Sequence, residues 1–600
     1  MSALLSALAL THTLGGGCPN PATAFAGGVA SDTLCSATAV QAGLTVVDLR
    51  DGWAPYPLAG APLDAGLEVP EYAGTFVDLA SGRFDATPEG ALAESDRYLE
   101  LYGVPPTPSR VLAAMSDEAR HTCHDALDPA GATSLAALEG TMRHERRADA
   151  KTRRTELRRA RARVKASMRR LGVDTRVELR AKGERYAGLV DALEQAEAAD
   201  GAIRALQGRL RCDGLLHAAA RDGDFDWATR QALATFQRRH ALVSSGVLDA
   251  TTRDYLQLSS RELDYRLALR LLRARVADAA GLIADGSAIG EQGAVFGRLL
   301  DEPALRYPNA DEPLEGGVGD TLSPATEAAA EALGWTSFEA TRDWLKRHVL
   351  ETEGGQLVAV ALPERPAHLK SGTRLRVEID GGGANRRGPG ERRPQLTLSA
   401  EVDGAWTPLV RWPTTVGGWQ DERQESGRVR RTYKASEYGP RHWRQLVVAP
   451  VWYPPQSTPH DDLVGLVNGQ RQVKEALIGP SYRSAYGLVM LVHDRELEGA
   501  GENGEPSWYD AGIRTHGSAN YRSIIRGSSH GCHRLYNVHV LRLANYLLKT
   551  QEHEAKGALD EEHLRRSFRY RGQSWTISRD ERGFAYEFAE PIPVDVREGA

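Results

Sequence analysis

The chain of 600 residues has 74 lysines and arginines against 80 aspartates and glutamates, a formal net charge of −6. With 41% hydrophobic and 26% charged residues, it has the balance of an ordinary globular protein of about four domains. This composition excludes a basic nucleic-acid-binding chain, a disordered acidic chain and a collagen-like chain, so we expect no nucleic-acid partner. The sequence contains no run of 18 consecutive apolar residues, so no membrane-spanning helix is predicted.

The first 18 residues resemble a short export segment. Residues 3–10 are an apolar run, and small residues follow it up to a lipobox-like Gly16-Gly17-Cys18. The positively charged start of an export signal is missing, so a flexible apolar N-terminus is the alternative. In the first interpretation Cys18 carries a lipid that anchors the protein to a membrane.

Five cysteines are spread through the chain without a C-x-x-C pair, which is too few and too scattered for a disulfide scaffold. They are Cys18, Cys35, Cys123, Cys212 and Cys532. Because the number is odd, at least one thiol has no partner within the chain. The sequence leaves the pairing of Cys35, Cys123 and Cys212 open.

The region before the first recognisable motif is expected to be partly helical. Residues 19–140 contain proline-rich turns and one helical pattern at residues 92–102, and no role is predicted for them. Residues 141–200 are strongly basic, and Leu157 and Val164 belong to an apolar stripe that predicts an amphipathic helical hairpin. Its arginines are typical of a solvated surface, or of a patch for nucleic acid, anionic lipid or an acidic wall polymer.

Residues 201–260 contain two turns that are each followed by a helical pattern, and Asp249 is suited to cap the second helix. This segment resembles the small three-helix peptidoglycan-binding domain. The matching residues are Phe225, Asp226, Thr229, Ala232, Leu233, Phe236, Gln237, Gly246, Leu248, Asp249 and Thr252. Most of them are core or cap residues, so the resemblance supports the fold better than it supports sugar binding.

The predicted secondary structure changes from helical to mainly β near residue 356. Residues 261–355 are predicted to be a helical linker region, whereas residues 356–596 alternate strands with glycine-rich turns and predict a mainly β domain. Strands are expected at residues 357–362, 375–379, 395–398, 446–448 and 487–492. The predicted fold class is therefore multidomain, with mainly α-helical regions before a mainly β domain.

Residues of reactive types crowd into two segments of the β domain. The segments are His516-Gly517 and Ser528-Ser529-His530-Gly531-Cys532-His533-Arg534. Nearby imidazoles and a guanidinium favour a thiolate, and a glycine before the cysteine lets backbone N–H groups converge on a carbonyl oxygen. Zinc binding by His516, His530, Cys532, His533 and His539 is one alternative, although the spacing fits no zinc framework well. Histidines that only stabilise a core are another.

The two segments resemble the signature of the L,D-transpeptidases with the YkuD-type catalytic domain. That signature is a histidine, a loop, and then (Ser/Thr)-His-Gly-Cys-x-(Arg/Asn), which His516 and residues 529–534 reproduce. Residues 413–420, 448–455 and 591–594 resemble further segments of the family. Residue 533 is usually apolar there and is histidine here. The resemblance covers roughly residues 356–596 and implies a β-sandwich-like catalytic domain.

The resemblance implies roles for individual residues. Cys532 would be the nucleophile and His516 the general base, and backbone N–H groups of residues 530–532 would hold the oxyanion. Arg534 would position the loop or a substrate carboxylate. His530 would be a second base and Gly531 completes the catalytic set, whereas the substrate-binding residues would be Ser529, Gly517 and Trp452.

The implied activity is peptidoglycan L,D-transpeptidation, which forms 3→3 cross-links between stem peptides through a cysteine thioester. The alternatives are an L,D-carboxypeptidase that trims tetrapeptide stems and a non-catalytic wall-binding scaffold. The expected partners are peptidoglycan stem peptides and glycan, and no metal or other cofactor is expected. The substrate implies an extracytoplasmic location in the periplasm or cell envelope.

Overall fold

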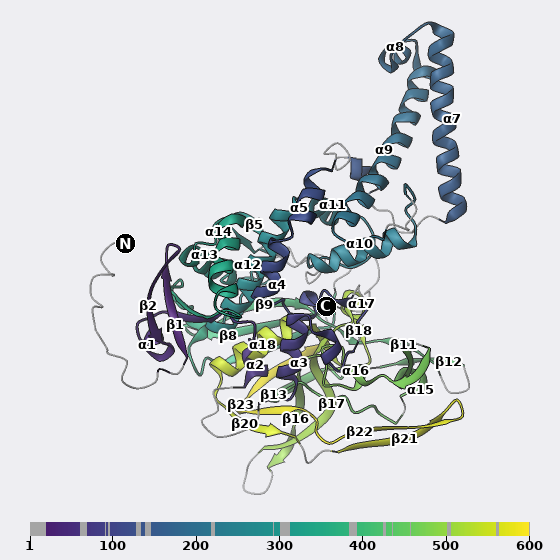
Figure 1. The fold of residues 1–600 in the computed structure, drawn as a ribbon. Helices are drawn as coiled ribbons and strands as arrows, with labels where there is room; N and C mark the ends of the chain where they lie inside the picture. Colours follow the sequence, from purple (N-terminus) through teal and green to yellow (C-terminus); the bar gives the residue numbers. More distant parts are fainter. Residues whose placement is uncertain are drawn as a thin grey trace.

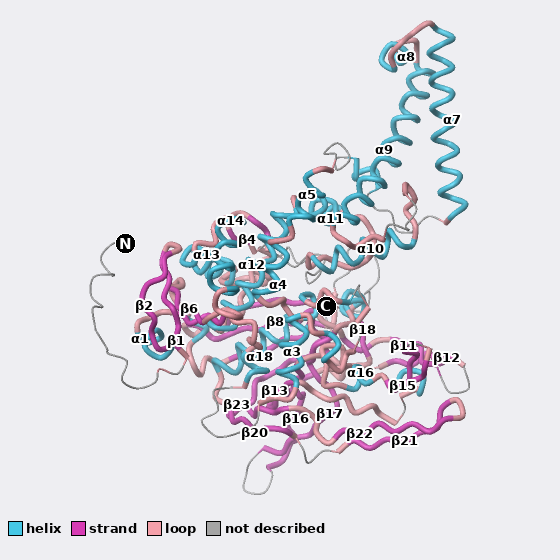
Figure 2. The backbone as a smooth tube through the Cα atoms, viewed as in Figure 1, coloured by secondary structure: helices cyan, strands magenta, loops and turns pink. Residues whose placement is uncertain are grey.

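The computed structural model describes most of the chain (Figure 1). The described residues are 18, 20–60, 69–90, 92–93, 96–127, 134–138, 146–217, 222–291, 293–300, 313–382, 393–423, 428–434, 436–456, 458–467, 469–500, 506–559 and 563–598. They form a helical body on a large C-terminal sheet, a small sheet at one side, and a helical arm that projects away from the body (Figures 1 and 2). This arrangement confirms the predicted fold class, with helical regions before a mainly β C-terminal part.

Four short strands join the start of the chain to its middle. They are β1 (Pro21–Ala26), β2 (Val29–Cys35), β3 (Thr45–Asp48) and β6 (Leu357–Val360), in the order β2-β1-β6-β3. β1 pairs with β6 in parallel. β6 thus lies outside the large C-terminal sheet, and the boundary predicted at residue 356 falls inside this small sheet. Apolar alternation predicts a strand but not its partner, which is why the sequence could not place β6.

α12 (Ser260–Ala280) lies at the centre of the helical body and packs against α13 (Leu322–Leu333) and α14 (Phe338–Leu345). The rings of Trp335 and Trp344 are fully buried there, 5.3 Å apart. One hydrophobic core continues from these helices into the C-terminal sheet. The region predicted as a helical linker is therefore part of the main core. The remaining short elements of the body are α1 (Ser36–Gln41), α2 (Tyr56–Ala59), α3 (Tyr72–Ser81), α4 (Pro108–Met115), α5 (Glu118–Asp125), β4 (Ala294–Val295) and β5 (Arg298–Leu299).

The projecting arm is an antiparallel pair of long helices, α7 (Arg147–Leu171) and α9 (Glu184–Cys212), joined at its tip by α8 (Arg176–Arg180) (Figure 1). Leu157 and Val164 of α7 belong to the buried seam between them. The predicted amphipathic hairpin is thus confirmed. α9 continues beyond the boundary predicted at residue 200, because its apolar residues change partner there without a helix break.

The next module is a compact unit of three helices: the C-terminal turns of α9, α10 (Trp227–Arg239) and α11 (Ala250–Gln257). Asp226 caps α10 by accepting the Thr229 N–H at 2.9 Å, and Asp249 caps α11 by accepting the Thr252 N–H at 2.7 Å. The cap predicted at Asp249 is confirmed.

The C-terminal sheet has nine strands in the order β19-β17-β16-β13-β23-β7-β8-β9, and β20 also pairs with β23. Its strands are β7 (Leu375–Asp380), β8 (Gln395–Val402), β9 (Ala405–Pro413), β13 (Gly439–Val448), β16 (Val489–Ala500), β17 (Pro506–Ser518), β19 (His533–Tyr536), β20 (His553–Ala558) and β23 (Phe584–Arg597). The long strand β23 pairs with β20 through its first half and with β7 through its second, so the sheet divides along it. The buried helix α18 (Asn537–Thr550) packs between the sheet and the helical body.

Several small elements surround the sheet. They are the strand pairs β10 (Val416–Gly417) with β18 (Ser528–Ser529), β11 (Trp419–Arg423) with β12 (Val429–Tyr433), β14 (Val464–Val467) with β15 (Gln470–Val473) and β21 (Leu564–Tyr570) with β22 (Gln573–Arg579), and the helices α15 (His460–Leu463), α16 (Glu475–Ile478) and α17 (Tyr521–Arg526). The five strands expected from the sequence coincide with β6, β7, β8, β13 and β16. The helix expected at residues 92–102 is wrong for the described end of that segment, because residues 97–99 have no regular structure and Glu100–Tyr102 form a 3₁₀ turn.

The cysteines pair as Cys18 with Cys35 and Cys123 with Cys212, which leaves Cys532 as the free cysteine within the described residues. A sulfur in a disulfide cannot carry a lipid thioether, so the predicted anchor at Cys18 is wrong. Residues 1–17 lie outside the described residues, and with them most of the predicted export segment. No described helix combines the length and the apolar character needed to cross a membrane.

Gly355, which precedes β6, offers a test of how the small sheet joins the body. Its φ is +94°, and an added Cβ would lie 2.1 Å from the Leu49 carbonyl oxygen. Gly372 has a φ of +73° with no atom within 4 Å of an added Cβ. We expect Gly355→Ala to cost about 3 kcal/mol and Gly372→Ala about 1 kcal/mol of stability. Thermal unfolding measures both, and equal shifts in the midpoint would contradict the close contact at Leu49.

Candidate active site

The pairing of β17 with β19 brings the two motif segments together. The strands run parallel, and the register places His516 opposite Arg534. Cys532 lies directly before β19, at the end of the connection that begins after β17. β18 holds this connection in place by pairing with β10, with Gly417 opposite Ser529.

Three hydroxyl groups fasten the turn before β19. Ser529 Oγ accepts the Gly531 N–H at 3.1 Å and donates to the Cys532 carbonyl at 2.5 Å. Thr415 Oγ1 donates to the same carbonyl at 2.9 Å, and Ser436 Oγ donates to the Gly531 carbonyl at 2.9 Å. Gly531 has a φ of 120°, a conformation that L side chains rarely adopt. The turn therefore depends on glycine at this position and on hydroxyls from outside the motif.

One expected oxyanion donor is already used. The Gly531 N–H bonds to Ser529, so it is not available to a ligand, in contrast to the sequence-based expectation. The Cys532 N–H has no hydrogen-bond partner within the described residues. The prediction came from the motif alone, which does not show that the Ser529 hydroxyl folds back onto the turn.

The Cys532 thiol is half-buried. Burial raises its pKa above the usual value, and a hydrogen bond from the Arg514 main chain with the charges of Arg514 and Arg534 opposes this rise. The side chain therefore rests as a neutral thiol at neutral pH and needs a base to become a nucleophile.

His516 is buried in a defined orientation. Its Nδ1 lies 2.7 Å from the Gly517 carbonyl oxygen, so Nδ1–H is the donor and Nε2 is left as an acceptor. Burial, with the charge of Arg534, lowers the pKa of His516 to about 3. The ring of Tyr486 packs edge-on against it at 5.1 Å. The imidazole is thus neutral, with the lone pair of Nε2 left as an acceptor.

Two arginines near Cys532 differ in their partners. Arg514 donates two hydrogen bonds of 2.6 Å to the carboxylate of Asp510, which neutralises it. Arg534 forms no ion pair with any described carboxylate, and its Nε is buried without a hydrogen bond. Burial lowers the pKa of Arg534, and the nearby Cys532 opposes this shift. Arg534 is the cation that remains available to an anionic ligand.

A buried polar network lies behind the motif. His493 Nε2 accepts from Trp443 Nε1 at 3.0 Å and contacts Thr515 Oγ1 at 2.8 Å. His533 Nδ1 lies 3.0 Å from the Thr415 carbonyl, and its ring is 5.2 Å from that of His493. His533 therefore faces the core, where burial lowers its pKa to about 4.

Gly517 is enclosed by the start of α18. A Cβ at Gly517 would lie 2.1 Å from Asn537 Oδ1, and one at Gly487 would lie 2.3 Å from the same atom. Asn537 Oδ1 accepts the Leu488 N–H, and its Nδ2 donates to the Tyr482 carbonyl. Gly517 thus serves close packing and orients His516 through its carbonyl.

The other predicted site residues lie at different depths. Ser529 is buried within the turn, whereas His530 is exposed. Trp452 is partly buried in a small cluster with Val451 and Ile478. His539 is stacked on Trp412 at 4.4 Å, away from the other candidate zinc ligands. The described residues contain no group of three or more potential metal ligands.

Sequence reasoning missed the residues that support the motif from other elements. They are Thr415, Ser436, Tyr486, His493, Asp510, Arg514 and Asn537. Thr415 lies within a segment that had been matched to the family and Arg514 lies two residues before His516, so both carried a weak signal. Asp510 and Asn537 lie within six residues of the motif but match no part of its signature, and Ser436, Tyr486 and His493 are separated from it in sequence.

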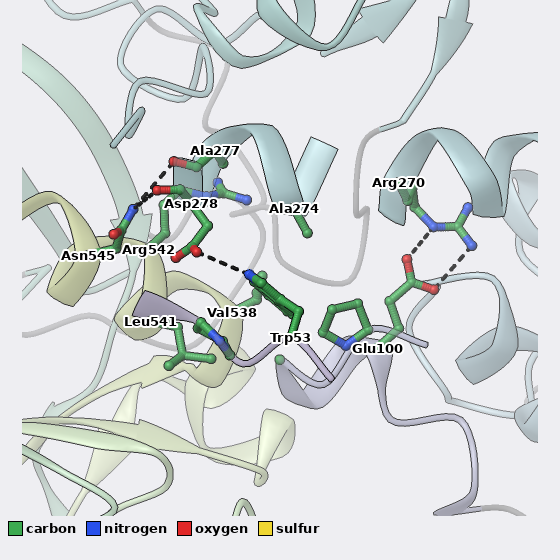
Figure 3. Close-up of a pocket in the computed structure, with 13 residues that line it drawn as sticks. Trp53, Glu100, Arg270, Ala274, Ala277, Asp278, Val538, Leu541, Arg542 and Asn545 are labelled. Carbon is green, nitrogen blue, oxygen red and sulfur yellow. Dashed lines mark hydrogen bonds and ion pairs between the residues drawn. The ribbon is translucent and has the colours of Figure 1, made fainter. Parts of the chain in front are cut away.

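A separate pocket lies between α12 and α18 (Figure 3). Its charged groups are satisfied locally: Arg270 Nε donates to Glu100 at 2.5 Å, and Trp53 Nε1 donates to Asp278 at 3.2 Å. None of the motif residues lines it. The pocket therefore contributes no group to the candidate site.

The three-helix module has a polar framework that repeats within it. Gln207 accepts the Gly223 N–H at 2.7 Å and donates to Thr229 Oγ1 at 3.0 Å. Gln237 in the same way accepts the Gly246 N–H at 2.8 Å and donates to Thr252 Oγ1 at 3.0 Å. Each buried glutamine thus ties a helix to the turn that starts the next one.

Comparison with protein families identifies this module. The model described as "Putative peptidoglycan binding domain" matches residues 199–256. The chain therefore contains a peptidoglycan-binding domain, as predicted at residues 201–260, and this domain implies a cell-wall-associated location. No curated protein matches the chain.

The arrangement of sulfurs predicts which thiol reacts in the folded protein. We expect iodoacetamide to modify Cys532 alone without reduction, because Cys18, Cys35, Cys123 and Cys212 are paired. The raised pKa of Cys532 predicts a rate that increases about tenfold per pH unit below that pKa. Peptide mapping by mass spectrometry, with Cys532→Ser as control, measures the label. Modification of another cysteine, or none at Cys532, would contradict the pairing.

Proposed function

We propose that this protein is a cysteine-dependent L,D-transpeptidase that acts on peptidoglycan stem peptides. The observation that carries the proposal is the orientation of His516, whose Nδ1 is engaged by Gly517 so that Nε2 is left as an acceptor, on the strand that pairs with the one directly after the free Cys532. The motif resemblance and the peptidoglycan-binding domain support the same substrate.

In the first step His516 Nε2 takes the thiol proton while Cys532 Sγ attacks the carbonyl of the third residue of a tetrapeptide stem. The tetrahedral intermediate collapses to a thioester, and the bond to the terminal D-Ala breaks. The proton on His516 passes to the amine of the departing D-Ala. In the second step the side-chain amine of a neighbouring stem attacks the thioester and gives a proton to His516. The bond from the carbonyl carbon to Cys532 Sγ then breaks, and His516 returns this proton to the sulfur, which restores the thiol and the neutral imidazole.

The Cys532 N–H is the backbone donor best suited to the oxyanion, because the Gly531 N–H is engaged by Ser529. Such a donor contributes about 3 kcal/mol to the transition state. The hydroxyls of Ser529 and Thr415 hold the Cys532 carbonyl, and this fixes the direction of the peptide groups in the turn.

Arg534 is suited to bind a carboxylate of the stem peptide. A partly buried guanidinium without a carboxylate partner among the described residues is a strong hydrogen-bond donor to a bound anion. Arg514 is less suited, because Asp510 occupies its donors.

Water in place of the amine would make the enzyme an L,D-carboxypeptidase. The decisive experiment incubates the purified protein with a disaccharide-tetrapeptide and analyses the products by mass spectrometry. A dimer that has lost one D-Ala supports transpeptidation, and a tripeptide monomer supports the carboxypeptidase. A wall-binding scaffold without catalysis would leave the substrate unchanged, and would be unaffected by Cys532→Ala.

We predict graded losses of activity for three substitutions in this assay. Cys532→Ala abolishes product formation, and His516→Ala reduces kcat by about 10²- to 10⁴-fold because it removes the base. Arg534→Ala raises KM by about 10- to 100-fold through loss of a charged hydrogen bond. The exposed Arg526 is the matched control, and Arg526→Ala leaves both constants unchanged. Equal effects at Arg534 and Arg526 would refute the carboxylate role.

The pH dependence tests the base. His516 must be neutral, so its function is lost as pH falls through its pKa, which lies near 3 and not in the ordinary histidine range. We expect kcat/KM to stay constant from about pH 5 to 8 and to fall only at more acidic pH. An ordinary histidine would instead produce a fall between pH 7 and 6. A midpoint near 6.5 would contradict the buried, neutral state of His516.

A further inference from the structure

The projecting arm carries an unusual charge distribution. α7 contains eleven lysines and arginines but only Asp149 and Glu156 as acidic residues, in a chain whose net charge is −6. The first half of α9 is acidic by contrast. In the arm, the strongly basic helix α7 therefore packs against the acidic first half of α9.

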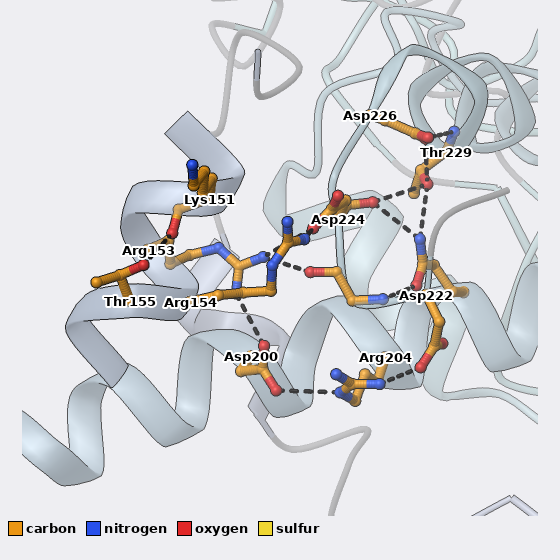
Figure 4. Close-up of polar contacts among 12 residues, drawn as sticks. Lys151, Arg153, Arg154, Thr155, Asp200, Arg204, Asp222, Asp224, Asp226 and Thr229 are labelled. Carbon is orange, nitrogen blue, oxygen red and sulfur yellow. Dashed lines mark hydrogen bonds and ion pairs between the residues drawn. The ribbon is translucent and has the colours of Figure 1, made fainter. Parts of the chain in front are cut away.

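Part of the α7 charge is neutralised within the protein. Arg161 pairs with Glu197 of α9 at 2.9 Å, and Arg153 pairs with Asp200 at 2.9 Å. Arg153 and Arg154 also reach Asp224 in the turn before α10 (Figure 4). These contacts lie along the flank of α7 that faces α9 and the three-helix module.

Six other cations on α7 form what we call the outward face. They are Lys151, Arg158, Arg159, Arg163, Lys165 and Arg169, and all are exposed. None forms an ion pair with a carboxylate of the described residues. Their mutual repulsion is therefore uncompensated within the described part of the chain.

We propose that the outward face of α7 binds the surface of an anionic phospholipid bilayer. At 100° per residue the six cations spread over about 160° of the helix, on the side opposite Leu157 and Val164. Along the axis they span about 27 Å. Such a two-dimensional array fits a plane of phosphates better than it fits a single polymer chain.

The residues between these cations also fit a membrane surface. Ala162 and Ala166 are small and exposed on the same side, so the long basic side chains can reach a plane without obstruction. No large apolar side chain of α7 is exposed, so the helix has none to insert below the headgroups. Binding at headgroup depth is electrostatic and sensitive to salt.

The position of the arm also leaves its outward face accessible to a membrane. It projects from the body, so the outward face is not covered by the C-terminal sheet (Figure 1). The pairs of Arg153 and Arg154 with Asp224 hold α7 against the peptidoglycan-binding module (Figure 4). The proposal does not depend on the chemistry proposed for Cys532.

The test is sedimentation of the full chain with vesicles of equal phosphatidylglycerol and phosphatidylcholine, and with vesicles of phosphatidylcholine alone. We expect binding only to the anionic vesicles. Raising the ionic strength from about 0.1 to 1 M shortens the Debye length from about 10 to 3 Å and should release the protein. Binding to both vesicle types, or binding unaffected by salt, would overturn the proposal.

Matched variants locate the surface. Each basic residue near an anionic membrane contributes about fivefold in affinity, so replacing Arg158, Arg159, Arg163 and Arg169 with glutamine should weaken binding by a hundredfold or more. Glutamine preserves helix propensity, and circular dichroism checks that the arm is intact. The control replaces four exposed arginines of the C-terminal hairpins, Arg430, Arg471, Arg565 and Arg569, and should bind as the unchanged protein does.

Two results would overturn the assignment to lipid. Equal losses in the two variants would mean that net charge, and not the outward face, determines binding. Binding to soluble polyphosphate or to an oligonucleotide, with no binding to anionic vesicles, would show that the face recognises a polyanion of another class.

Discussion

The parallel pairing of β17 with β19 is the constraint on which the candidate site depends. It places His516 opposite Arg534, although a long connection separates them in the chain. Parallel strands cannot be joined by a tight turn, so the connection must cross over, and residues 519–532 with α17 form it. Thr415 fastens the end of this connection: its Oγ1 accepts the Arg534 N–H and donates to the Cys532 carbonyl. The position of the thiol is therefore set by backbone pairing and by the hydroxyls of Thr415, Ser436 and Ser529.

Burial lowers the pKa of His516 and raises the pKa of Cys532. It keeps the imidazole of His516 neutral and the thiol of Cys532 protonated, so the resting site holds no ion pair between them. Arg534 also lies in this partly buried environment without a carboxylate partner among the described residues. An anion that binds there replaces lost hydration with a charged hydrogen bond, and this favours a ligand that carries a carboxylate.

The sequence predicted the parts of the site that are close together in the chain. The motif around Cys532 and the Asp249 cap of the three-helix module could be predicted from residue types and short spacings. Ser436 and His493 could not, because their contacts with the motif arise only when distant strands pair. For the same reason β6 was placed in the C-terminal domain, since its apolar pattern is equally compatible with either sheet.

The continuous helix α9 connects the arm to the peptidoglycan-binding module. The first turns of α9 belong to the arm, and its last turns belong to the peptidoglycan-binding module. The disulfide Cys123–Cys212 joins the end of α9 to α5. At the base of the module, Asp264 of α12 receives hydrogen bonds from Arg120 and His121, which follow the start of α5. These contacts are buried, and Leu263 of α12 belongs to the hydrophobic core of the module, so α12 joins the module to the body. The module is therefore held against the core that supports β17 and β19 by α9, by the disulfide and by α12.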